Sequence, residues 1–100
     1  MKVVTLDAEL EKSIITSLTT GEHGMYLALS PDTMQNIITQ LSEEVKKFNG
    51  LAQDPIILTS QVVRIHFYRL IEQFYPNVSV LSFNEINNNI QIQAVGNITM

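Results

Sequence analysis

The sequence predicts a single α/β domain, with three amphipathic helices packed against a four- to five-stranded mixed sheet. Three observations predict this class. Apolar residues recur at helical spacing in three segments, short apolar runs rich in Val and Ile alternate with those segments, and the last apolar positions alternate with glutamines. A chain of 100 residues is long enough for one such domain and too short for two.

The first strand and helix are predicted from the N-terminal residues. Val3 to Leu6 form a short apolar run, and Asp7 is a good N-cap for a helix that extends to about Leu18. Leu10 and Ile14 fall four residues apart on that helix, so one of its faces is apolar. Residues 19–21 end the helix, and residues 25–29 are predicted as a second short strand.

The second helix has the clearest start in the chain. Ser30 can accept from the first free N–H groups, Pro31 lacks an N–H that would be left unpaired, and Asp32 faces the positive end of the helix dipole. Apolar residues then keep helical spacing as far as Phe48, and Asn49-Gly50 provides a left-handed stop.

The remaining elements follow from residues 55–94. The unbroken run at 56–58 predicts a strand buried on both faces, Ser60 is predicted to cap a third helix, and residues 78–81 predict another strand. The alternating residues 90–94 predict a last strand, expected to be antiparallel because its connection looks too short for a crossover. The expected core consists of Leu10, Ile14, Ile37, Ile38, Leu41, Ile57, Phe67, Leu70, Ile71, Phe74 and Val80.

Composition excludes several functions. The net charge is −4 and the six basic residues are scattered, which argues against nucleic-acid binding. There is no cysteine for disulfides or thiol chemistry, and no apolar run approaches the roughly 20 residues that span a bilayer, so no membrane contact is expected. Only 16% of residues are charged, which is typical of a piece of a larger protein, although amide and hydroxyl side chains are an alternative polar cover.

Catalysis, metal binding and cofactor binding have little support. The four glycines form no phosphate-binding pattern, and the paired glutamates lie on solvated helix faces. The competing hypothesis is a small enzyme or ligand-binding domain that uses His23, His66 and Glu85. It requires these three side chains to converge in one pocket. We therefore expect no enzyme activity, no metal and no cofactor.

Two segments are candidates for protein contact. The third helix carries Arg and Tyr at i, i+4 spacing, and these residue types often anchor interfaces, although an exposed face with ion pairs is the alternative. A polar segment with one aromatic residue follows the strand at 78–81, where short polar side chains alternatively serve as caps. The candidate contact residues are Arg64, Tyr68, Arg69, Ser82, Phe83, Asn84 and Glu85.

Several segments resemble, in the same order, the FlhA family of type III secretion export-gate proteins. They are Thr5-Leu6-Asp7 with Glu11, Leu27 to Asp32, Pro55 to Arg64, Val80 to Ile86, and Gln93 to Gly96. The injectisome export gate is a close relative, and the residues from Val80 to Ile86 favour the flagellar branch.

The resemblance implies that residues 1–100 are one domain, the last subdomain of the cytoplasmic region of a larger bacterial inner-membrane protein. In that family the cytoplasmic regions form a homo-oligomeric ring that receives export substrates, their chaperones and the ATPase stalk. The isolated chain is then expected to be monomeric. The alternative is a free-standing cytosolic α/β domain that regulates by binding another protein.

Overall fold

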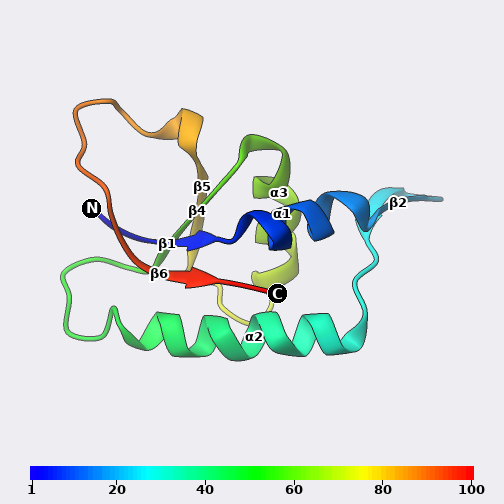
Figure 1. The fold of residues 1–100 in the computed structure, drawn as a ribbon, viewed down its shortest axis with the longest axis horizontal. Helices are drawn as coiled ribbons and strands as arrows, with labels where there is room; N and C mark the ends of the chain where they lie inside the picture. Colours follow the sequence, from blue (N-terminus) through cyan, green and yellow to red (C-terminus); the bar gives the residue numbers. More distant parts are fainter.

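The structure, a computed structural model that describes residues 1–100, combines a parallel sheet, a β-hairpin and three α-helices (Figure 1). In chain order the elements are β1 (Lys2–Leu6), α1 (Ala8–Thr16), β2 (Leu18–Gly21), β3 (Gly24–Leu27), α2 (Pro31–Lys46), β4 (Ile56–Thr59), α3 (Gln61–Ile71), β5 (Ser79–Ser82), the 3-10 turn η1 (Phe83–Glu85) and β6 (Gln93–Ile98). The α/β class and the three helices are therefore confirmed.

The four-stranded sheet has the order β5-β4-β1-β6, and each neighbouring pair of strands is parallel. Val4 of the central strand β1 lies opposite Ile57 on one side and Gly96 on the other, and Ile57 lies opposite Val80. Neighbouring residues of a sheet point to the same face, so these positions share one face of the sheet.

The expected antiparallel direction of the last strand is wrong. β6 pairs with β1 at the opposite edge of the sheet, not with β5, which precedes it in the sequence. The connection from β5 to β6 contains η1 and crosses between the two edges without an α-helix. Ten extended residues reach about 33 Å, whereas three strand spacings amount to about 14 Å. Residues 83–92 are therefore long enough for a crossover.

A second difference is the β2–β3 hairpin. Helix α1 ends at Thr16, and residues 18–21, expected as the end of the helix and a stop, pair antiparallel with residues 24–27. Gly24 has φ +105°, a left-handed conformation that glycine adopts without strain and that closes the tight turn. The strand predicted at residues 25–29 therefore belongs to this hairpin, which extends away from the sheet (Figure 1).

One hydrophobic core joins all three helices to one face of the sheet. It contains Val4, Leu6, Leu10, Ile14, Ile37, Leu41, Phe48, Ile57, Val63, Phe67, Ile71, Val78, Val80 and Ile98. Eight of the eleven expected core residues are buried, whereas Ile38 and Leu70 are only partly buried. Phe74 is 51% exposed, because it lies beyond the end of α3 and no longer follows the helical phase.

Two of the three predicted helix caps have the expected hydrogen bonds. Asp7 accepts from the Glu9 N–H at 3.2 Å, and Ser30 accepts from the Thr33 N–H at 3.2 Å. Ser60 occupies the N-cap position of α3 but makes no side-chain cap. Its own N–H instead donates to Glu11 Oε2 at 3.0 Å, so a residue on α1 ties down the start of α3.

Candidate protein-contact surfaces

The structure brings the start of α3 next to the segment that follows β5. Arg64 Nε lies 3.0 Å from Glu85 Oε1, and Asn84 Nδ2 donates to Gln61 Oε1 at 2.7 Å. We call the surface formed by Gln61, Arg64, Phe83, Asn84 and Glu85 the Arg64–Glu85 patch. It contains residues from both segments that the sequence marked as candidates.

Glu85 is held in place by several donors at once. Its Oε1 atom accepts from the Ser82 N–H at 3.2 Å and from Ser82 Oγ at 3.1 Å, in addition to the contact with Arg64. This reciprocal cap satisfies the backbone at the start of η1. Ser82 is only 2% exposed, so it is buried beneath the turn. Ser82 and Glu85 therefore cap this connection, as the alternative interpretation of the segment expects.

Phe83 projects from the turn that these bonds fix. Its exposed fraction is 55%, so it does not pack in the core of this domain. An aromatic side chain held on a rigid turn loses little conformational entropy on binding. Phe83 is therefore the most prominent apolar feature of the Arg64–Glu85 patch.

The three candidate residues on α3 do not form one stripe. At about 100° per residue, Tyr68 lies on the same flank as Arg64, and Tyr68 is partly buried against the core. Arg69 is five residues from Arg64 and points in another direction. It lines a groove between α3 and the hairpin. Arg69 therefore belongs to a different surface from Arg64.

The competing ligand-binding hypothesis lacks the required geometry. Glu85 contacts Arg64, His66 lines the groove on the other flank of α3, and His23 lies in the hairpin turn. Neither the cavity beside Phe48 nor the groove between α3 and the hairpin is lined by more than one of these residues. No three His, Asp or Glu side chains form a group that could hold a metal ion.

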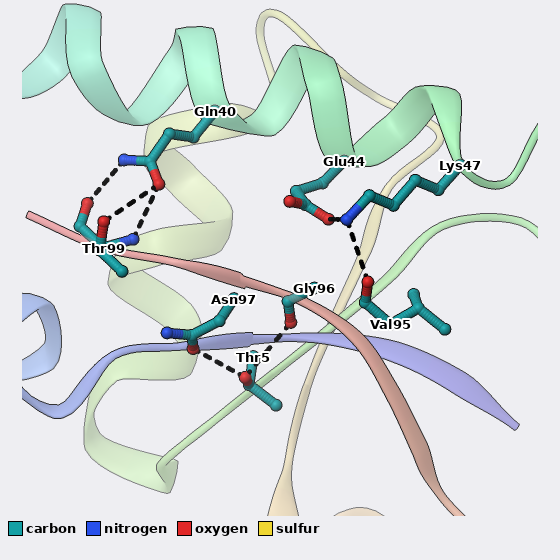
Figure 2. A network of polar contacts seen from close by, with 8 residues as sticks. All are labelled: Thr5, Gln40, Glu44, Lys47, Val95, Gly96, Asn97 and Thr99. Carbon is teal, nitrogen blue, oxygen red and sulfur yellow. Dashed lines mark hydrogen bonds and ion pairs between the residues drawn. The ribbon is translucent and has the colours of Figure 1, made fainter.

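A polar network between α2 and β6 was not anticipated (Figure 2). Gln40 pairs with the main chain of Thr99 much as a neighbouring strand does: its Nε2 donates to the Thr99 carbonyl at 2.7 Å, and its Oε1 accepts from the Thr99 N–H at 2.9 Å. Lys47 Nζ donates to the Val95 carbonyl at 3.0 Å. These side chains cover the outer edge of β6, which reduces its capacity to pair with another strand.

Glu44 lies inside this network, although the sequence suggests a solvated helix face. Its side chain is 14% exposed, and its Oε2 contacts Lys47 Nζ at 2.9 Å (Figure 2). The carboxylate fills the space where Gly96 has no side chain, and a Cβ on residue 96 would collide with it. Only the absence of a side chain at position 96 permits this close approach of the Glu44 carboxylate to β6.

We expect Gly96→Ala to lower the free energy of unfolding by about 1–2 kcal/mol, because the added methyl group displaces the Glu44 carboxylate. Urea denaturation measures the change. In a Glu44→Ala background the same substitution should cost less than about 0.5 kcal/mol, because the obstacle is gone. Equal costs in both backgrounds would contradict this account of Gly96.

Comparison with known proteins identifies the family. Residues 1–91 match the FHIPEP family. The chain belongs to the FHIPEP family. It is 34% identical over 96 residues to the "Flagellar biosynthesis protein FlhA" of Bacillus subtilis. The match covers 96% of this chain and 14% of FlhA, so the chain spans about a seventh of that relative.

Solved structures of FHIPEP-related proteins share the fold. CdsV of Chlamydia pneumoniae, solved in complex with CdsO, is 34% identical with a TM-score of 0.85, over 98% of this chain and 29% of CdsV. The nonameric SctV-C of EPEC is 28% identical with a TM-score of 0.83, over 98% of this chain and 29% of SctV-C. The resemblance to type III export-gate proteins is therefore confirmed. None of the helices combines the length and apolar character needed to cross a bilayer.

Proposed function

We propose that this chain is a non-catalytic cytoplasmic subdomain, the last one, of a larger export-gate protein in the bacterial inner membrane. The subdomain contributes a protein-contact surface to the homo-oligomeric ring that receives chaperone–substrate complexes and the ATPase stalk. The observation that carries this proposal is the likeness, over 98% of the chain, to an SctV-C that forms a nonamer. The complex of CdsV with CdsO supports a partner protein for gates of this fold.

The Arg64–Glu85 patch is the surface we assign to this role. It follows the carboxyl end of a parallel strand, the usual functional edge of such sheets. Glu85 uses only Oε1 for its contacts within the chain, which leaves Oε2 free to accept from a partner. Arginine and aromatic residues are enriched among the residues that dominate binding energy. The patch thus offers an apolar anchor beside a fixed carboxylate.

Replacing Phe83 with alanine tests this role. In the full-length protein, we expect secretion and partner binding to fall by about tenfold, because about 1.4 kcal/mol of contact energy is lost. The fold should be unaffected, since Phe83 is 55% exposed. Secretion assays and binding to purified ATPase stalk measure the effect, and circular dichroism checks the fold. Arg64→Gln, which removes the charge and shortens the polar side chain, should act in the same direction.

The matched control is Phe74→Ala, which removes an equally exposed phenylalanine from the other end of the sheet. Unchanged secretion and binding in Phe83→Ala would show that the patch is only a solvated surface. Separately, a reading frame that continues upstream of Met1 into membrane-spanning segments supports the export gate, whereas an in-frame stop codon supports a free-standing regulatory domain. Sedimentation of the isolated chain tests the expected monomer.

A further inference from the structure

A groove lies between the β2–β3 hairpin and α3, on the flank of α3 away from the Arg64–Glu85 patch. Its volume is about 380 Å³, and most of its lining is apolar. Met25, Leu29, Met34 and Leu70 line it, with Arg69 and His66 on the helix side. Met25 is 52% exposed and neighbouring Tyr26 53% exposed, so the hairpin wall is open to solvent. Flexible methionines adapt to the shape of a partner's side chains.

The groove carries an unpaired positive charge. The chain contains three ion pairs, Lys46 with Glu43, Lys47 with Glu44, and Arg64 with Glu85, and Arg69 takes part in none of them. No Asp or Glu lines the groove. An arginine beside apolar side chains, in a chain with a net charge of −4, selects a carboxylate from outside the chain.

The shape of the groove favours a helix over a strand. Both walls present side chains, because α3 faces the hairpin across the groove and its backbone groups are already paired within the helix. An added strand would have to pair with the outer edge of β3, which is only four residues long, so it would use only one wall of the groove. An amphipathic helix instead inserts apolar side chains spaced at i, i+3 or i+4 and i+7.

We propose that this groove binds an amphipathic helix of a partner protein, with apolar side chains between Met25 and Leu70 and a Glu or Asp against Arg69. A second copy of the chain fits less well, because a symmetric contact between two grooves brings Arg69 of each copy to the same interface. This inference is independent of the proposed function, which uses the Arg64–Glu85 patch on the other flank of α3.

The test is selection from a displayed library of helical peptides of about 15 residues. The apolar face is fixed at i, i+3, i+4 and i+7, and the flanking positions vary among Glu, Gln and Lys. We expect the wild-type chain to select Glu beside the apolar face. The Arg69→Glu variant should select Lys, and peptides selected on the wild type should bind it about tenfold more weakly or worse. Fluorescence anisotropy measures these affinities.

Two control variants locate the site. Lys12→Glu reverses an exposed positive charge on α1 that does not line the groove, and it should leave selection and affinity unchanged. Met25→Ser should weaken binding without changing the preference for Glu, because it removes only apolar contact. Thermal denaturation verifies that each variant is folded.

Three results would overturn the proposal. The first is selection of no binder, or of the same peptides whether residue 69 is Arg or Glu. The second is a dimer in sedimentation that Arg69→Glu dissociates, which would assign the groove to a second copy. The third is binding to the isolated chain but not to the longer export-gate protein, which would show that the rest of that polypeptide covers the groove.

Discussion

Replacing Phe67 with alanine is expected to lower the free energy of unfolding by about 3–5 kcal/mol. Phe67 is fully buried and is the largest of the completely enclosed side chains. It lies on α3 within the core shared by all three helices and the sheet, so its removal leaves a cavity whose walls belong to several elements. A domain of this size has a total stability of about 5–15 kcal/mol, so the variant retains only a small margin.

Chemical denaturation followed by circular dichroism measures this loss. Phe74→Ala is the matched control, because it makes the same chemical change at a phenylalanine that is 51% exposed. We expect the control to cost less than about 1 kcal/mol. A similar shift of the urea midpoint in both variants would show that burial does not determine the contribution of these side chains.

Ile57→Ala is expected to cost about 2–5 kcal/mol. Ile57 is 1% exposed on β4, and it lies opposite Val4 on one neighbouring strand and Val80 on the other. Truncating it removes contacts with both neighbouring strands and with the helices above them. The cavity forms in the middle of the sheet, where parallel strands on both sides limit how far the backbone can relax.

Two further alanine variants serve as comparisons for the stability of Ile57→Ala. Ile15→Ala, at a position of α1 that is 45% exposed, should change stability by no more than about 0.5 kcal/mol. Leu70→Ala should fall between the two, at about 1 kcal/mol, because Leu70 is partly buried despite its expected place in the core. An Ile57 variant as stable as the Ile15 variant would contradict the assigned register of β4.

Local sequence signals predicted the elements that depend on local physics. Ser30 and Pro31 start α2 where expected, and Gly50 has a left-handed φ of +84°, although α2 already ends at Lys46 and not at Phe48. Non-local choices were not predictable in this way. The direction of β6 depends on which strand it joins, and the N–H of Ser60 donates to Glu11, which is 49 residues away in the sequence. Neither choice leaves a signal in the segments themselves.

The arrangement of the candidate contact residues in space was predicted only in part. The sequence singled out Arg64 and Glu85 separately, and the structure shows that they touch. It also grouped Arg69 with Arg64, although a separation of five residues on a helix turns their side chains about 140° apart. The groove beside Arg69 could not be foreseen, because its other wall is a hairpin that the sequence partly assigned to a helix.

The pairing of β6 with β1 makes the sheet depend on contacts between residues about 90 positions apart in the sequence, such as Lys2 and Gln93. Until Gln93–Ile98 pair, β1 keeps one edge open, and Ile98 closes a core in which it is fully buried. Contacts over such sequence separations slow folding. A folding intermediate without β6 keeps one side of β1 unpaired, and exposed strand edges recruit other chains or chaperones. The β1–β6 contact therefore determines whether this edge of the sheet is exposed to aggregation.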